Sequence, residues 1–264
     1  MTKKQARPGE VEQYFPDIQE VPVDAPVQWL KRGWQDLKAC PAASLFYGAC
    51  FVIGGYLMIF SLRDAPEYIA AVITGFVIAG PFLALGLYEL SAQRERGEAC
   101  ALAPSLMAWR KNLGHMGIFA AILLLVYLAW ARASVVVFAM FYSGALPTMG
   151  DLFKHLIFTD QLDFLLVYFG VGLIFVLIIF GISLISIPLI KDKQMDAVTA
   201  AIASVRALLR NPTAMTVWAS IITLLTVFSM ATLLLGTLVA GPLLGHATWH
   251  AYRDLTGSRV AVDP

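Results

Sequence analysis

The sequence predicts an all-α, polytopic membrane protein with six transmembrane helices arranged as three hairpins. Of its 264 residues 59% are hydrophobic and only 14% are charged, and the mean hydropathy is +0.72. An ordinary soluble domain carries about 25% charged residues, so a single soluble core cannot bury this excess. Uncharged stretches long enough to cross a bilayer recur along most of the chain. The net charge of +1 shows no basic excess, so nucleic acid is not expected as a partner.

The chain begins with a polar tail, residues 1–23, which we expect to be flexible. It has no early apolar run, so a cleavable signal peptide is not expected. An amphipathic helix is predicted next, with Asp24 and Pro26 as start signals. Its apolar face would hold Val27, Leu30, Trp34 and Leu37. Its polar face would hold Gln28, Lys31, Arg32, Gln35, Asp36 and Lys38.

A single transmembrane domain, residues 24–254, is predicted to precede a C-terminal tail, residues 255–264. Each crossing needs about 20 apolar residues in continuous helix, because hydrocarbon offers backbone groups no hydrogen-bond partner. The third crossing contains Arg132, which we place at its outer boundary as an interfacial anchor. The six predicted helices are 42–62, 68–90, 114–142, 164–190, 213–229 and 234–252.

The boundary between the last two helices is the hardest to place. Residues 211–252 carry no charged side chain. One straight helix of that length would measure about 63 Å, about twice the hydrocarbon thickness of a bilayer. The chain must therefore fold back, and we place the turn between Ser229 and Gly236.

The distribution of cations tests the number of crossings, because loops rich in Lys and Arg stay in the cytoplasm. With six helices and both termini inside, 16 of the 19 Lys and Arg residues fall in inner segments. Only Arg63 and Lys154 fall outside, and Arg132 lies at the edge of the third helix. A five-helix layout would expel the tail with Arg253, so the six-helix layout is preferred.

An amphipathic stretch precedes each of the three predicted hairpins, and the middle copy is the weakest. Before the third hairpin, Arg206 and Arg210 lie beside an apolar stripe and Asn211-Pro212 follows. Such helices are expected to lie in the cytoplasmic interface with the apolar side toward the membrane. A calmodulin-like or coiled-coil partner is the competing interpretation. The stripe of the third copy is Met195, Val198, Ile202, Val205 and Leu209.

A second internal similarity links residues 75–88 with residues 236–249, 161 positions later. Both segments contain a Gly-Pro pair, at Gly80-Pro81 and at Gly241-Pro242. The match predicts parallel repeats, and each proline is expected to bend its helix. The glycines favour close helix packing, and the alternative is a hinge or the wall of a substrate cavity.

His246 and His250 are four residues apart, so a helix places both imidazoles on one face. We expect a polar cluster near the cytoplasmic ends of the second and sixth helices, in which Glu89 pairs with His250. Interface anchoring is the simplest role, and metal or haem binding and a proton or substrate site are the alternatives. Ala247 stands where a zinc protease needs Glu, which excludes that chemistry on this segment. The cluster would comprise Tyr88, Glu89, His246, His250, Tyr252 and Arg253.

Cys40, Cys50 and Cys100 show no paired metal-ligand spacing and are expected to be reduced, buried thiols. No phosphate-binding loop, nucleophile elbow or CxxC motif is present, so no catalytic residue is predicted. Enzymatic activity is not indicated, although the absence of motifs does not exclude it.

The strings VQWLKRGWQDLKACPAASLFYG, GPFLALGLYELSAQRERGE and GPLLGHATWHAYRDL resemble a family of uncharacterised bacterial integral membrane proteins, a domain of unknown function. The resemblance covers residues 20–255. It implies a multi-pass protein of the bacterial inner membrane and supplies no activity, substrate or cofactor.

Three functions are compatible with these observations. The leading hypothesis is a non-enzymatic inner-membrane protein that acts as an accessory, assembly or organising component of a membrane complex, with lipid and other membrane proteins as partners. The alternative is a small transporter or channel with a cavity between the second and sixth helices. A third possibility, a haem- or metal-binding redox component, depends on His246 and His250 alone.

Overall fold

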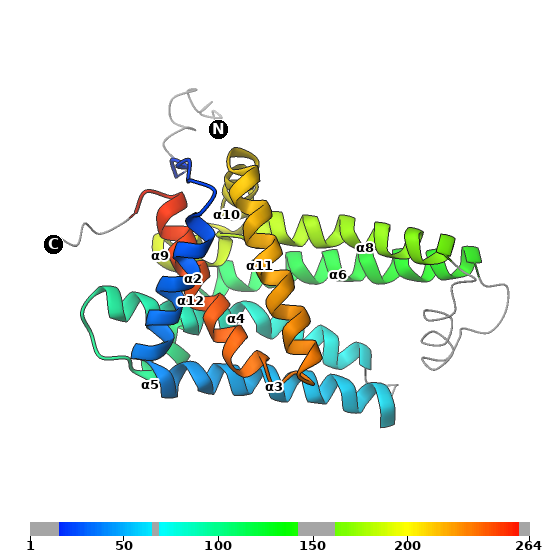
Figure 1. Cartoon of the computed structure of the whole chain (residues 1–264), viewed down its shortest axis with the longest axis horizontal. Helices are drawn as coiled ribbons and strands as arrows, with labels where there is room; N and C mark the ends of the chain where they lie inside the picture. Colours follow the sequence, from blue (N-terminus) through cyan, green and yellow to red (C-terminus); the bar gives the residue numbers. More distant parts are fainter. Residues whose placement is uncertain (1–15, 65–68, 142–161, 259–264) are drawn as a thin grey trace, which may run out of the picture.

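The computed structural model describes residues 16–64, 69–141 and 162–258, and every regular element in these ranges is a helix (Figure 1). Most of the predicted polar tail, and most of the segment between the third and fourth predicted helices, therefore lie outside the described residues. The helices are α2 (Ala25–Ala39), α3 (Pro41–Asp64), α4 (Ile69–Glu95), α5 (Leu102–Leu106), α6 (Leu113–Phe141), α8 (Leu162–Ser183), α9 (Ser186–Lys193), α10 (Ala197–Arg210), α11 (Pro212–Ala231) and α12 (Thr237–Leu255). A short 3₁₀-helix, Ala108–Asn112, joins α5 to α6.

Four helical stretches of the described chain are long and apolar enough to cross a membrane. They are Pro41–Ser61, Leu113–Phe141, Leu162–Lys193 and Pro212–Ala231. The all-α membrane class therefore holds. Six crossings in three hairpins remain a prediction, because α4 and α12 are not among the four stretches.

The last helix, α12, is the centre of the molecule. It packs mainly against α2 and α3 and also contacts α4, α11 and α9. Ala247, Trp249 and Ala251 on this helix are fully buried. The turn before it, residues 232–236, lies inside the interval that the sequence indicated.

Glycines allow the backbones of α2 and α3 to approach α12 closely. A Cβ atom added at Gly33 would lie 2.7 Å from the backbone nitrogen of Ala247, and one added at Gly48 would overlap the carbonyl oxygen of Leu238. Contacts of this kind are typical of helices that associate in membranes. Both Gly-Pro pairs lie within continuous helices, Gly80-Pro81 in α4 and Gly241-Pro242 in α12.

Helix α2 buries one face against the protein and leaves part of its predicted apolar stripe on the outside. Trp29 and Asp36 are almost fully buried, at 0% and 3% exposure, together with Gly33. Val27 and Trp34 are exposed, at 42% and 41%. The assignment of Asp36 to the polar, solvated face was therefore wrong. Gly33 explains the difference, because its missing side chain lets this face contact α12.

Helices α6 and α8 lie side by side and extend away from the remaining helices (Figure 1). Aromatic rings fill the seam between them: Phe138 contacts Phe164 with ring centroids 5.0 Å apart, and Trp130 contacts Tyr168 at 6.1 Å. Most other side chains of the pair face outward. Only 6% of the most apolar window of Leu113–Phe141 is buried inside the molecule, against 28% for Pro41–Ser61.

The N-terminal segment before α2 is fastened to parts of the chain that are distant in sequence. The amide of Gln19 donates to the carbonyl of Leu255 at 2.8 Å. Asn211 accepts from the amide of Val21 at 2.8 Å and donates to the carbonyl of Gln19 at 3.0 Å. These bonds hold residues 19–21 between the end of α12 and the start of α11.

Cys40 and Cys100 form a disulfide with a Cα–Cα distance of 5.6 Å, so the expectation of three reduced cysteines was wrong. The two residues are 60 positions apart, and spacing alone does not show that the loop after α4 returns to the α2–α3 junction. The distance is within the usual range for a disulfide.

We expect a maleimide-polyethylene glycol reagent to attach once to the denatured, unreduced protein, because only Cys50 is free. After reduction it should attach three times, once to each cysteine. The number of adducts is read as band shifts on a denaturing gel. Three adducts without reductant would show that the disulfide is absent.

Candidate functional site

A network of polar side chains is buried where four helices meet. It comprises Asp36 from α2, Ser44 from α3, Ser91 and Arg94 from α4, and His246 and His250 from α12. All except Arg94 are buried, and the exposure of Ser44, Ser91 and His246 is 0%. Buried polar groups of this kind persist only when they are hydrogen-bonded.

Asp36 is the acceptor at the centre of the network. Its Oδ2 accepts from the hydroxyl of Ser91 at 2.7 Å and from Nε2 of His250 at 2.9 Å. Its Oδ1 pairs with the guanidinium of Arg94. Burial by itself would raise the pKa of this carboxyl, but the hydrogen bond and charge of His250 and the hydrogen bond of Ser91 outweigh burial. The pKa of Asp36 is therefore lower than its ordinary value, and the side chain is an anion.

His246 extends the network toward α3. Its Nε2 lies 2.8 Å from the hydroxyl of Ser44, and its Nδ1 lies 2.8 Å from the hydroxyl of Ser91. Because Ser91 gives its proton to Asp36, its oxygen must accept from Nδ1–H of His246. In a neutral ring Nε2 then accepts from Ser44. A continuous chain of hydrogen bonds thus runs from Ser44 through His246 and Ser91 to Asp36.

This arrangement contains the residue types of a serine hydrolase, but it lacks the access that such chemistry needs. The Ser44 hydroxyl is buried against His246, so a substrate carbonyl cannot reach it. Both ring nitrogens of His246 are engaged by serine hydroxyls, so binding a metal or haem iron would require one of these bonds to break. Within the described ranges, His, Cys, Asp and Glu form no group of three or more that could hold a metal ion. The network instead joins α2, α3, α4 and α12.

A second polar cluster covers the ends of α4, α9 and α12. Glu89 binds Lys191 at 2.8 Å and Arg96 at 2.9 Å. Arg253 binds Glu95 at 2.8 Å. The Glu89–Lys191 pair joins α4 to α9, and the Arg253–Glu95 pair joins α12 to α4. The Glu89–Arg96 pair joins α4 to the turn that follows it.

Trp249 lies between two cations in this second cluster. Nζ of Lys191 is 4.7 Å from the ring centroid, and the guanidinium carbon of Arg253 is 4.9 Å from it. Tyr88 stacks on the same indole with centroids 6.4 Å apart. Tyr252 donates its hydroxyl to Asp192 at 2.6 Å. Cation–π and ion-pair contacts therefore fasten α12 to α4 and α9.

The residues predicted for a single polar cluster are divided between these two networks. His246 and His250 lie on one side of α12 and reach the Asp36 network, whereas Tyr88, Glu89, Tyr252 and Arg253 belong to the second cluster. His250 pairs with Asp36, and Glu89 pairs with Lys191, so the hypothesised Glu89–His250 pair is not formed. Sequence reasoning did not find Asp36, Ser44, Ser91 or Arg94. The available signal was Gly33, which marks the same face of α2 as Asp36.

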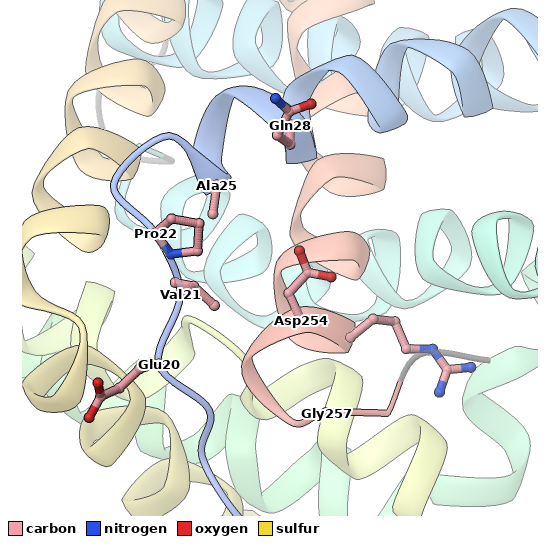
Figure 2. A pocket seen from close by; sticks show the side chains of 8 residues that line it. Glu20, Val21, Pro22, Ala25, Gln28, Asp254 and Gly257 are labelled. Atoms are coloured by element: carbon pink, nitrogen blue, oxygen red, sulfur yellow. The ribbon is translucent and has the colours of Figure 1, made fainter. Parts of the chain in front are cut away.

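A cavity of about 380 Å³ lies between the N-terminal segment and the end of α12 (Figure 2). Its charged side chains are already paired: Asp254 accepts from Nε1 of Trp29 at 2.8 Å and binds Arg32, Arg253 binds Glu95, and Glu20 binds Arg210. The cavity is therefore a weaker candidate site than the Asp36 network. The lining residues are Glu20, Val21, Pro22, Ala25, Gln28, Arg253, Asp254 and Gly257.

Comparison with known proteins supports the membrane class. No curated protein and no solved structure matches the chain. The closing string GPLLGHATWHAYRDL lies outside the range that a family model matches, so its resemblance remains a prediction. The expected similarity to integral membrane proteins of unknown function is confirmed for α4 through most of α9: residues 69–192 match the family described as predicted integral membrane protein, DUF2189.

Proposed function

We propose that the protein is a non-enzymatic component of a membrane assembly and contacts other membrane proteins through the α6–α8 hairpin. The observation that supports this most is the position of the hairpin. It extends from the body (Figure 1), and most side chains of α6 and α8 are exposed or half-buried. The buried polar networks, by contrast, hold the body together and leave its Ser–His–Asp groups inaccessible.

Arg132 is the feature of the hairpin that favours a protein partner. Its side chain is exposed on α6, inside the stretch Leu113–Phe141, and no ion pair joins it to another described residue. An arginine in the centre of a lipid-facing helix costs about 2.5–3.5 kcal/mol, and less toward the interface. A carboxylate or carbonyl on a neighbouring membrane helix would offset that cost.

The alternative of a transporter with a cavity between α4 and α12 has less support. A cavity of about 110 Å³ lies between α11 and α12, and its walls carry no charged side chain. Transport of a charged solute normally leaves ionisable groups facing the pathway. The lining residues are Leu225, Thr226, Ser229, Thr237, Ala240, Gly241 and Leu244.

A photo-crosslinking amino acid placed at Leu125 or Val136 should give the same discrete protein adduct in native membranes. Both side chains are exposed and share the helix face of Arg132. Phe60 of α3, 58% exposed, is the matched control and should give no such adduct. The adducts are detected on denaturing gels and identified by mass spectrometry.

The substitution Arg132→Gln should weaken the adduct from both positions, because it removes the cation that the partner neutralises. Arg132→Lys should retain most of it. If Leu125 and Val136 yield only lipid adducts, or the same proteins as Phe60, the hairpin is not a partner-binding surface.

A further inference from the structure

Helix α10 has two apolar faces, one with small, buried side chains and one with large, exposed side chains. Small side chains form the face that packs against the body: Ala200, Ala203 and Ala207 are 0–1% exposed. Large side chains face outward: Ile202 is 43% exposed and Leu209 is 73% exposed. A helix at a water-exposed surface would bury its large residues and expose polar ones. The outer face of α10 therefore suits an apolar medium.

The connection to α11 places this face beside the bilayer. Helix α10 ends at Arg210, and only Asn211 separates it from Pro212, the first residue of α11, which is a candidate membrane-spanning helix. The end of α10 must therefore lie near the membrane end of α11. Leu209, the most exposed residue of the stripe, stands at this junction.

Helix α2 repeats the arrangement. It ends at Ala39, and only Cys40 separates it from Pro41, the first residue of α3, another candidate membrane-spanning helix. Val27 and Trp34 are 42% and 41% exposed and share one side of the helix, and Val23 in the turn before it is 54% exposed. Exposed apolar residues continue into the first turns of α3, where Leu45 and Phe46 are 36% and 41% exposed.

Cations flank both stripes. Lys31 and Lys38 are exposed on α2, and Nζ of Lys38 lies 5.2 Å from the ring centroid of Trp34. Arg206 and Arg210 are exposed on α10, and Arg210 also contacts Glu20 at 3.4 Å. Apolar residues bordered by Lys and Arg are typical of helices that lie at the surface of a membrane with anionic lipids.

We propose that α2 and α10 lie in the headgroup region of an anionic bilayer, with their large apolar stripes inserted and their flanking cations bound to lipid phosphates. Each helix then fixes the depth of the membrane-spanning helix that follows it. The apolar surface of α2 is continuous with the exposed Leu45 and Phe46 at the start of α3, which favours lipid over a soluble partner. The inference is independent of the proposed role of the α6–α8 hairpin.

Nitroxide spin labels in lipid nanodiscs can test this placement. In a Cys50→Ala background, which retains the Cys40–Cys100 disulfide, labels are attached at Val27→Cys and Ile202→Cys. The matched control is Gln28→Cys, because Gln28 is exposed, adjacent to Val27 and off the stripe. Collision rates are measured with oxygen, which concentrates in hydrocarbon, and with a neutral nickel chelate, which remains in water. The nanodiscs contain phosphatidylcholine with or without phosphatidylglycerol.

With phosphatidylglycerol present, we expect the ratio of oxygen to nickel collisions to be higher at residues 27 and 202 than at residue 28. Replacing Lys31, Lys38, Arg206 and Arg210 with glutamine, or omitting phosphatidylglycerol, should lower the ratio at residues 27 and 202 toward that of the control.

Three results would overturn the proposal. Equal, nickel-accessible labels at all three sites would place the stripes in water. Labels shielded from both reagents would show that protein covers the stripes. A ratio that stays high regardless of lipid charge and of the glutamine substitutions would contradict binding to anionic headgroups.

Discussion

Replacing Asp36 with alanine should lower the free energy of unfolding by about 2–6 kcal/mol, because two buried donors, Ser91 and His250, lose their acceptor at a cost of about 1–3 kcal/mol each. The substitution leaves Arg94, His250 and Ser91 without their common acceptor, and Ser91 is fully buried. The loss should appear as a lower midpoint of thermal unfolding in detergent. The midpoint is measured from the amount of monodisperse protein that remains after heating to each temperature.

Asp24→Ala is the matched control, because Asp24 is exposed next to the same helix and makes no side-chain capping bond. Its unfolding midpoint should change little. The lowered pKa of Asp36 also sets the direction of the pH dependence. Its contribution is complete above about pH 4, the ordinary aspartate pKa, and is lost as pH falls through the lower pKa of the folded state. A wild-type midpoint that rises on acidification, or equal midpoints for the two variants, would contradict the assigned role.

Gly48→Ala should lower the free energy of unfolding by about 3 kcal/mol, at the upper end of the usual cost of overpacking. The new methyl group would overlap the carbonyl oxygen of Leu238, which is backbone and cannot rotate away. Helices α3 and α12 must separate to accommodate it, which weakens the hydrogen bond between Ser44 and His246. The same thermal assay measures the effect.

Gly170→Ala on α8 is the corresponding control. A Cβ atom at Gly170 meets no other atom within 4 Å, so this substitution should leave the unfolding midpoint nearly unchanged. If Gly48→Ala is tolerated as well as Gly170→Ala, the close approach of α3 and α12 does not exist.

Hydropathy and charge identified the helices well because both report on long, uninterrupted segments. They located most of the apolar helices to within about five residues, including the turn between α11 and α12, but the predicted helix 164–190 is divided after Ser183 into α8 and α9. They could not separate a helix that faces lipid from one surrounded by protein, because both are apolar on all sides. Helix α12 shows the difference: its glycines, alanines and histidines face α2, α3 and α4.

The polar network was harder to predict because its bonds join residues that are far apart in sequence. His250 and Asp36 are separated by 214 positions, and His246 and Ser44 by 202. Periodicity placed Asp36 with the lysines and glutamines of α2, since it weighs each residue by polarity and not by what it contacts. The His246–His250 spacing correctly indicated one helix face, but the spacing could not identify the acid opposite it.

The central position of α12 determines when this protein can mature during translation. The ribosome releases α2 early and α12 last, and the membrane helices between them leave the ribosome in the interval. Until the final helix emerges, Asp36 lacks His250, Gln19 lacks the Leu255 carbonyl and Trp29 lacks Asp254. A truncation that removes α12 would therefore disable the whole body instead of trimming one edge, because α2, α3 and α4 all pack against this helix.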